Sequence, residues 1–229
     1  MKKIDIFIRT YHKDLEFLKY CLRSIHKFVT GYNKIIICIP EEDAHLLQDW
    51  NLTQEEIILW NPVCKNGYID QQISKLKAYE MCDADYILYV DSDVCFTTPT
   101  DLSEFFVNDK PYLMKTRYEL VGDAICWKQC TEEILGITLK YEYMRRIPIM
   151  FKRSTLTALS KHIDVLELAK RERLSEFNLI GAFAALTNLD EYHIIDTEHE
   201  ALPKQVAKQF WSWGNITPKV KDELETILK

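Results

Sequence analysis

The residues best placed to do chemistry in this chain are two aspartates, Asp91 and Asp93, separated by a single serine. They directly follow the apolar run 86–90, which has the composition of a buried strand. In an open parallel sheet, ligands bind beyond the carboxyl ends of the strands. Two carboxylates this close repel each other unless positive charge lies beside them. Mg²⁺ or Mn²⁺ shared with substrate phosphates supplies such charge, since hard cations prefer oxygen ligands. A solvated acidic turn is the alternative interpretation.

The elements that must position the aspartates alternate between strand and helix patterns. Apolar or alternating runs bounded by turn residues predict four strands, at 3–9, 34–39, 56–60 and 86–90. Periodic apolar residues between them predict a helix from Asp14 to the break at Gly31, a short helix at 41–50 and another at 69–81. This β-α-β-α-β-α-β order predicts a parallel sheet with right-handed crossovers.

The second half of the chain has a less regular pattern. Helices are predicted at 154–170 and 175–187, and a strand at 192–196, before an aromatic tail at 210–214. Without a repeat, a low-complexity segment or a linker, residues 1–229 are expected to form a single domain. The predicted fold class is α/β, with a Rossmann-like, mostly parallel central sheet flanked by helices.

Composition narrows the classes of protein and partner. Apolar residues make up 47% of the 229 and charged residues 28%, as in a globular protein with a sizeable core. The net charge of −6 argues against a nucleic-acid partner. We expect a cytoplasmic protein with no membrane span, because no signal-peptide pattern opens the chain and no apolar run approaches the roughly 20 residues that cross a bilayer. The seven cysteines, with no CxxC pair, are expected to be mostly buried free thiols.

Several segments, taken in order, resemble GT-A-fold glycosyltransferases of bacteria and large viruses. They are the Gly-aromatic and Gln-Gln-x-x-Lys-Leu helix at 67–76, the Asp-Ser-Asp motif at 91–93, the Ser-Glu-Phe and Gly of 175–181, and the Gln-Phe-Trp-Ser-Trp-Gly tail at 209–214. The resemblance implies a GT-A-like domain with a nucleotide-binding half at 1–95 and an acceptor-side half at 96–229.

The resemblance also implies an activity. The expected reaction moves a sugar from a nucleotide-diphosphate sugar, with a UDP-sugar favoured, to a hydroxyl of a glycan or small-molecule acceptor. The expected cofactor is Mn²⁺ or Mg²⁺. Such an enzyme would be a hexosyl- or deoxyhexosyl-transferase of polysaccharide biosynthesis. The donor sugar and the stereochemical course do not follow from the resemblance.

Three residues after the first strand are candidates for the nucleoside side of the donor. Arg9 is expected to pair with phosphate, Thr10 to hydrogen-bond the base or ribose, and Tyr11 to stack on a ring. The alternative is an ordinary strand-to-helix loop in which Asp14 caps the following helix.

Further donor contacts are expected from the second long helix and the acidic motif. Gln72 and Lys75 are three residues apart and share a helix face. Lys75 is expected to offer its charge to phosphate or sugar hydroxyls, and a solvent-directed lysine is the alternative. Within the motif, Asp93 is expected to hold the metal, Asp91 to support the metal or ribose, and Ser92 to lie against the donor.

On the acceptor side, Glu176 is expected to act as the general base that deprotonates the incoming hydroxyl, with Asp123 in reserve. The alternative for Glu176 is a favourable interaction with the N-terminus of its own helix. His199, or else His193, is the candidate for a further metal ligand.

Two tryptophans in the tail, Trp211 and Trp213, are also assigned to the donor site. They are expected to stack on a sugar or cover the site, and the alternative is packing of the tail onto the domain.

Two other functions fit parts of the pattern. Residues 91–94 also match the D-x-D-x-[T/V] motif of haloacid-dehalogenase-like phosphatases, whose first aspartate is a nucleophile. In those enzymes the motif strand usually comes early, whereas three strands precede it here. The downstream candidate Asp123 lacks a second acidic residue four positions later. A non-catalytic carbohydrate-binding module is the other alternative, and it does not need two neighbouring carboxylates at a strand end.

Overall fold

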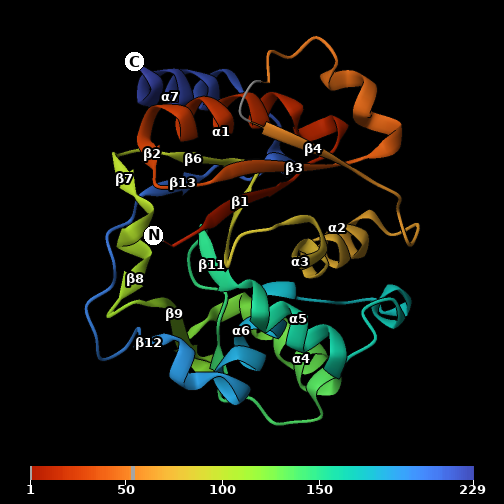
Figure 1. Cartoon of the computed structure of the whole chain (residues 1–229), viewed down its shortest axis with the longest axis vertical. Coiled ribbons are helices and arrows are strands. Elements are labelled where there is room, and N and C mark those ends of the chain that lie inside the picture. The colour runs from red at the N-terminus through yellow and green to blue at the C-terminus, as the bar shows by residue number, and fades with distance from the viewer. Residues whose placement is uncertain (1, 53–54) are drawn as a thin grey trace.

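A five-stranded sheet in the order β11-β5-β1-β3-β4 forms the centre of the computed structural model, which describes residues 2–52 and 55–229 (Figure 1). Four strands run parallel, namely β1 (Ile4–Arg9), β3 (Lys34–Pro40), β4 (Glu55–Trp60) and β5 (Tyr86–Asp91). The fifth, β11 (Ile149–Lys152), lies antiparallel at the edge beside β5. The predicted α/β class and parallel order of the first half are therefore confirmed.

Alternating side chains explain why the sheet is covered on both faces. Every residue of β1 is buried. Ile6 and Ile8 pack on the side of α1 (Leu15–Phe28), whereas Phe7 packs on the side of α2 (Gly67–Leu76). A parallel strand buried on both faces carries such a nearly continuous apolar run, which is the pattern that predicted it.

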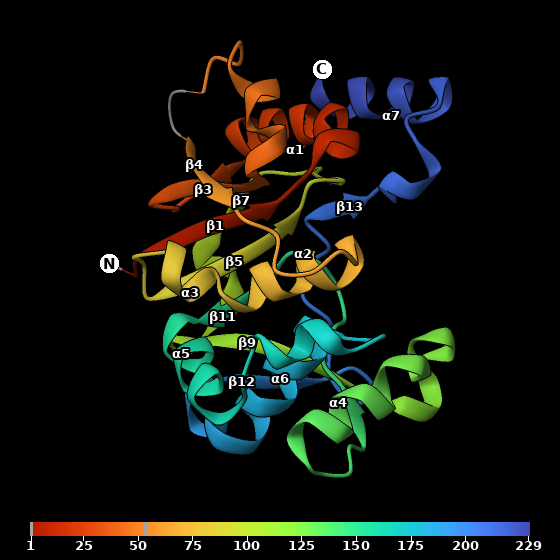
Figure 2. The same cartoon turned by 90° about the vertical axis from the view of Figure 1, so that its right-hand side faces the viewer.

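One face of the sheet carries two layers of helix (Figure 2). Leu18 and Ile25 of α1 pack against the sheet. On its outer side, α1 meets α7 (Pro218–Leu228), whose Leu224 packs with Phe17 and Tyr20. The C-terminal helix thus covers α1 rather than the sheet.

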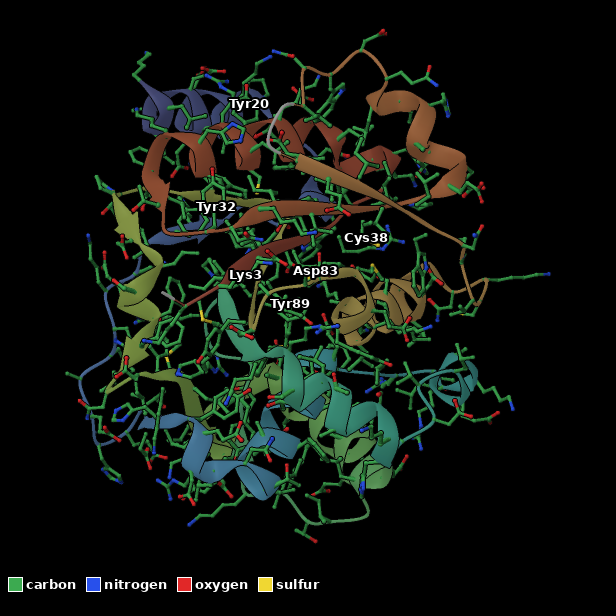
Figure 3. All side chains as sticks on the ribbon, in the orientation of Figure 1. Lys3, Tyr20, Tyr32, Cys38, Asp83 and Tyr89 are labelled. Atoms are coloured by element: carbon green, nitrogen blue, oxygen red, sulfur yellow. The ribbon has the colours of Figure 1, made fainter. Side chains whose placement is uncertain are left out.

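The other face is covered by α2, α3 (Ala78–Met81), α5 (Arg153–His162) and α6 (Glu176–Thr187). Tyr89 of β5 lies at the centre of this interface (Figure 3). Its ring makes edge contacts with Phe7, Phe151 and Phe177 at centroid distances of 5.7, 6.0 and 5.5 Å. The Tyr89 hydroxyl donates to the backbone oxygen of Lys75 at 2.9 Å, which ties α2 to β5.

The close contact between α6 and Tyr143 explains why residue 181, within α6, is a glycine. A Cβ atom at this position would lie 2.4 Å from Cβ of Tyr143, well inside contact distance. The Tyr143 N–H also donates to Oδ1 of Asn178 on the same helix, at 2.8 Å. The absence of a side chain at Gly181 therefore lets α6 pack directly on the segment after β10 (Tyr141–Glu142).

The remaining strands form smaller sheets. A second sheet has the order β10-β9-β12, in which β9 spans Lys110–Arg117 and β12 spans His193–Asp196. A short strand, β8 (Phe106–Val107), also pairs with β9. Two-stranded ribbons join β6 (Val94–Phe96) to β13 (Ala207–Gln209), and β2 (Val29–Thr30) to β7 (Thr100–Asp101). The remaining α-helix, between η5 and β10, is α4 (Lys128–Leu135).

Short 3-10 helices connect these elements. They are η1 (His12–Asp14), η2 (Glu41–Leu47), η3 (Leu102–Phe105), η4 (Tyr118–Leu120), η5 (Gly122–Trp127), η6 (Glu167–Lys170), η7 (Leu189–Glu191) and η8 (Ser212–Gly214). The short helix predicted at 41–50 is thus a 3-10 helix that ends at Leu47.

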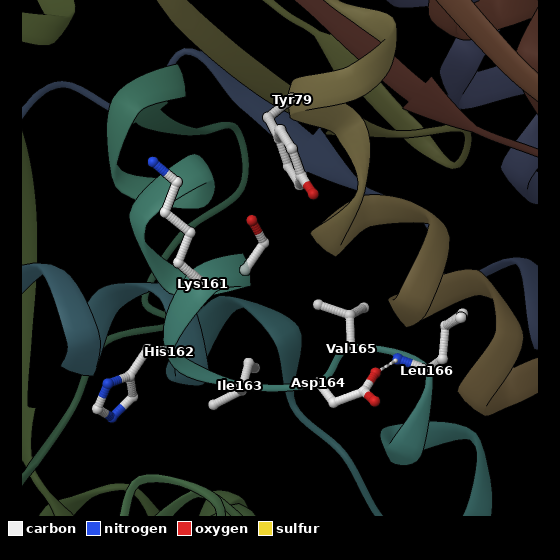
Figure 4. Close-up of a pocket in the computed structure, with 8 residues that line it drawn as sticks. Tyr79, Lys161, His162, Ile163, Asp164, Val165 and Leu166 are labelled. Carbon is white, nitrogen blue, oxygen red and sulfur yellow. Dashed lines mark hydrogen bonds between the residues drawn. The ribbon is translucent and has the colours of Figure 1, made fainter.

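The helix predicted at 154–170 is wrong in its second half, because α5 ends at His162. Oδ1 of Asp164 accepts the N–H of Leu166 at 2.9 Å and that of Glu167 at 3.4 Å (Figure 4). Such local side-chain bonds compete with the helix and start a new turn instead.

Two composition-based predictions can be compared with the structure. All seven cysteines are unpaired and five are buried, as expected. Within the described ranges, no helix has both the length and the apolar character that a membrane crossing requires.

Candidate functional site

The carboxyl ends of two neighbouring parallel strands define the site. Arg9, the last residue of β1, lies opposite Asp91, the last residue of β5. Thr10 continues from β1, and Ser92 and Asp93 continue from β5, all three buried. The parallel pairing of β1 with β5 therefore brings the predicted nucleoside residues and the acidic motif to one edge of the sheet.

Lys75 joins the acidic motif to α6. Its Nζ donates to Oδ1 of Asp91 at 2.7 Å and to Oε1 of Glu176 at 2.9 Å. The ammonium also lies over the ring of Phe177, 4.7 Å from its centroid. Lys75 is only 6% exposed, and the two carboxylates raise its pKa against the opposing effect of burial. A buried lysine kept charged in this way holds both acids in place.

Gln72 fixes the start of α6 from the same face of α2. Its Oε1 accepts the backbone N–H of Glu176 at 3.1 Å, and its Nε2 donates to the backbone oxygen of Tyr68 at 3.1 Å. The shared helix face predicted for Gln72 and Lys75 thus places both side chains on the first residue of α6.

The tail holds Asp93 on the opposite side of the motif. Oδ1 of Asp93 accepts Nε2 of Gln209 at 3.2 Å, and its Oδ2 accepts the N–H of Ser212 at 2.8 Å. Burial, then the charge of Asp91, raises the pKa of Asp93 to about 6. The bonds from Ser212 and Gln209 oppose this increase but do not cancel it.

Trp211 and Trp213 flank the residue that binds Asp93. They are 56% and 82% exposed, and their rings make an edge contact at a centroid distance of 6.0 Å. Trp211 has φ of 50°, in the left-handed region that non-glycine residues seldom adopt. Both rings therefore project from the tail instead of packing it onto the domain.

Asp14 is a further residue of the site, although its position before an amphipathic helix suggests only a helix cap. It occupies the N-cap position of α1 but makes no capping bond with its side chain. Instead, its Oδ2 accepts the hydroxyl of Ser92 at 3.3 Å. Burial is the largest cause that raises its pKa, and the charge of Asp91 adds to it. The alternative in which Asp14 caps the helix with its side chain therefore does not hold, and Asp14 faces the acidic motif.

Arg9 is directed into the protein. Its Nε donates to Oγ of Ser74 at 2.9 Å, and its NH2 group lies 3.4 Å from Oδ2 of Asp70. Asp70 also accepts Nε1 of Trp60 at 2.9 Å and the N–H of Val63 at 2.7 Å. Arg9 therefore pairs with the carboxylate that fixes the loop after β4, whereas a phosphate contact was predicted for it.

Thr10 and Tyr11 differ in their surroundings. The N–H of Thr10 donates to the backbone oxygen of Cys38 at 3.0 Å, and its buried Oγ1 has no hydrogen-bond partner within the described part of the chain. Tyr11 is 38% exposed, and its ring makes an edge contact with His12 at 5.3 Å. An unpaired hydroxyl at this strand end is compatible with a polar ligand group nearby.

The other candidates lie in different parts of the fold. His199 follows β12 of the second sheet, and its N–H donates to the backbone oxygen of Asp196. His193 begins β12 and lines a shallow hollow with Tyr112. Asp123 is exposed on η5. A second hollow, between α3 and α5, is lined by Tyr79 and residues 160–166, none of which belongs to the acidic motif (Figure 4).

The side chains available as metal ligands determine how a metal ion would be held. Among the residues that the structure describes, no three His, Cys, Asp or Glu side chains are arranged to bind a metal by themselves. His199 therefore does not complete a site with Asp91 and Asp93. The two aspartates still fit a hard divalent cation, because their mutual repulsion contributes to the raised pKa of Asp93. Remaining ligands would come from substrate oxygens and water, as is usual for Mg²⁺.

Comparisons with known proteins place the chain in a family. Residues 4–216 match DUF6492, a family of unknown function, and the chain belongs to it. No curated protein matches the chain. Among solved structures, the glycosyltransferase GlyE of Streptococcus pneumoniae is similar, with 13% identity and a TM-score of 0.47. The similar region covers 85% of this chain and 45% of the GlyE chain, so this chain spans less than half of that structure.

Proposed function

We propose that this member of DUF6492 is a glycosyltransferase that moves a sugar from a nucleotide-diphosphate donor, favouring a UDP-sugar, to an acceptor hydroxyl. The observation that carries the proposal is the contact of Lys75 with both Asp91 and Glu176. It joins a metal-type acidic motif at the end of β5 to a carboxylate at the start of α6, where acceptor chemistry would need one. A carbohydrate-binding module does not require this pairing.

On the donor side, Asp91 and Asp93 would hold Mn²⁺ or Mg²⁺. A bound cation would supply positive charge against the diphosphate that leaves with the bonding electrons. Thr10 and Tyr11 would line the nucleoside end, and Trp211 and Trp213 would cover the donor from the tail.

Lys75 has a different role from the phosphate contact predicted for it. Its ammonium already contacts two carboxylates and lies over the ring of Phe177. It therefore acts as a positioning residue that sets the distance between the acidic motif and Glu176. Gln72 assists by binding the Glu176 N–H.

Glu176 would act as the general base in a direct displacement. Lys75 fixes its Oε1, and we assign its Oε2 to the acceptor hydroxyl. As the acceptor oxygen bonds to the anomeric carbon, its proton passes to Glu176. The bond from the anomeric carbon to the donor phosphate breaks, and its electron pair goes to the diphosphate.

The proposal is tested by thermal shift with a panel of nucleotide-sugars, each with and without Mn²⁺. A ligand that binds only the folded protein adds about 2.7 kcal/mol at 100 times its dissociation constant. One nucleotide-sugar is expected to raise Tm in a Mn²⁺-dependent way in wild type and in Asp190→Asn, an exposed control. Asp93→Asn should abolish the effect. Absence of any such shift in the wild type would refute the proposal.

The competing functions give different results with the same protein. A carbohydrate-binding module would show no metal-dependent hydrolysis of the donor. A phosphatase would hydrolyse phosphate esters and lose that activity in Asp91→Asn, and it would bind beryllofluoride tightly. The transferase is expected neither to hydrolyse phosphate esters nor to bind beryllofluoride tightly.

A further inference from the structure

Two aromatic residues from distant parts of the sequence form a stack at the surface beside α6. Tyr68, in the first turn of α2, is 42% exposed. Its ring stacks on that of Trp127, the last residue of η5, with centroids 6.0 Å apart and planes inclined by 25°. Neither residue belongs to the donor site described above.

Hydrogen bonds fix the backbone at both aromatic residues. The N–H of Tyr68 donates to Oδ1 of Asn66, which caps α2, at 3.1 Å. The backbone oxygen of Trp127 accepts Oγ1 of Thr131 at 2.9 Å and Sγ of Cys130 at 3.2 Å. A stack supported in this way presents its faces without first losing much conformational freedom, which favours binding.

The stack lies next to the predicted catalytic carboxylate. The Tyr68 hydroxyl donates to the backbone oxygen of Leu174, two residues before Glu176, at 3.3 Å. Gln72 bonds to the backbone of both Tyr68 and Glu176. Burial raises the pKa of Tyr68, and the charge of Glu176 raises it further. α6 packs against both α2, which carries Tyr68, and α4, which directly follows Trp127.

Two exposed apolar side chains lie on the 3-10 helices that lead up to Trp127. Leu120 on η4 is 56% exposed and Ile125 on η5 is 48% exposed. η5 leads through Trp127 directly into α4, so Ile125 is only two residues from the stacked tryptophan. Aromatic and aliphatic groups bordered by a carboxylate suit a ligand with an apolar face and a hydroxyl edge.

We propose that the Tyr68–Trp127 stack binds a pyranose ring of a glycan acceptor and presents its hydroxyl edge to Glu176. The C–H face of a pyranose is apolar and weakly positive, and it packs on the negative face of an aromatic ring. The same ring's hydroxyls point outward from its edge, where a neighbouring carboxylate can accept a proton. The acceptor is therefore a carbohydrate rather than a protein or lipid hydroxyl. This inference rests on the proposed function.

The test uses the full chain without donor or metal, so that it is independent of donor binding. Saturation-transfer NMR is recorded with methyl glucosides, methyl galactosides, methyl N-acetylglucosaminides and the corresponding di- and trisaccharides. At least one glycan is expected to bind wild type and the exposed control Leu189→Ala equally. Trp127→Ala and Tyr68→Ala should each bind it at least tenfold more weakly. Trp127→Phe, which keeps a ring, should recover part of the affinity and guards against misfolding of the alanine variant.

Two outcomes would overturn the inference. One is a wild type that binds none of these glycans, and the other is a folded Trp127→Ala variant that binds them as wild type does. If Mn²⁺-dependent donor binding is still observed in either case, the transferase proposal stands and only the acceptor role of the Tyr68–Trp127 stack is refuted. If glycans bind through the stack but no nucleotide-sugar binds, the stack stands and the transferase proposal is lost.

Discussion

Replacing Asp93 with asparagine should stabilise the protein while removing its response to metal. The Asp93 carboxylate is 8% exposed and close to Asp91, and its pKa is raised from 3.8 to about 6. In Asp93→Asn the charge disappears. The amide can still bond to Ser212, and the Gln209 amide can turn to offer its oxygen. The substitution therefore removes an unfavourable ionisation with little change in shape.

The size of the effect follows from the two pKa values. Because the folded protein binds the Asp93 proton more tightly than the unfolded chain, the free energy of unfolding falls as pH rises from about 4 through 6. The full loss is about 2–3 kcal/mol, at 1.36 kcal/mol for each pKa unit. Asp93→Asn lacks this loss. Its advantage over wild type should therefore grow by about 2–3 kcal/mol between pH 4 and 7.5, which corresponds to about 4–12 °C in Tm.

Thermal unfolding of both proteins in EDTA, from pH 4 to 8, measures this difference. Groups that titrate alike in the two proteins cancel, so the pH-dependent part of the difference reports on Asp93 and on the groups it influences. Asp190→Asn, at an exposed position, should run parallel to wild type. A repeat with Mn²⁺ and a nucleotide-sugar should raise Tm in wild type and in Asp190→Asn but not in Asp93→Asn. A Tm difference between Asp93→Asn and wild type that stays constant with pH would refute the unfavourable buried charge. An equal Mn²⁺-dependent rise in Tm in the two proteins would refute the assignment of Asp93 as a metal ligand.

Three further substitutions test other parts of the site and its support. Lys75→Met leaves two carboxylates without their cation and should cost about 3 kcal/mol in urea unfolding. Lys77→Met, at a more exposed ion pair two residues further along the chain, should change stability by less than about 0.5 kcal/mol, and equal losses in the two variants would contradict the bridging role of Lys75. Gly181→Ala places a Cβ 2.4 Å from a neighbouring side chain and should cost about 1–3 kcal/mol or more by thermal unfolding, unlike Gly67→Ala, which meets nothing within 4 Å. Asp14→Asn should reduce the Mn²⁺-dependent rise in Tm at pH 7.5 without lowering the Tm of the metal-free protein; an undiminished rise would exclude Asp14 from the metal environment.

Local sequence pattern predicts the two strands that carry the acidic motif and the residues after β1, but not that these strands are neighbours. The apolar runs of β1 and β5 identify both strands, and their parallel pairing alone brings Thr10 and Asp91 to one edge. The three-residue spacing of Gln72 and Lys75 likewise predicts that both leave α2 on one side. These features depend on periodicity over a few residues, which the sequence displays directly.

The partners of those residues could not be predicted in the same way. Lys75 meets Glu176 across 101 positions, and Asp93 meets Ser212 across 119. No local signal specifies such contacts, since they depend on how α6 and the tail return to the sheet. The antiparallel edge strand β11 shows the same limit, because its four residues lack a length or period that would distinguish them.

Asp14 illustrates a second kind of limit. An aspartate before an amphipathic helix is the usual signal of an N-cap, and the backbone position is as expected. Its carboxylate instead accepts the hydroxyl of Ser92, which lies 78 positions away. One sequence signal thus fits two roles, and only the three-dimensional position of the acidic motif decides between them.

The distribution of charge indicates where a cation would be held. Lys75 contacts Asp91 and Glu176, whereas the raised pKa values belong to Asp93 and Asp14, on the side of the motif that faces the tail. Positive charge is therefore most needed between Asp91, Asp93 and Asp14, not beside Glu176. A cation held there would leave Glu176 and the Tyr68–Trp127 stack free for an acceptor. The same arrangement explains why the variants that weaken metal binding should not lower stability: a charge that helps bind a cation is a charge that the metal-free fold is better without.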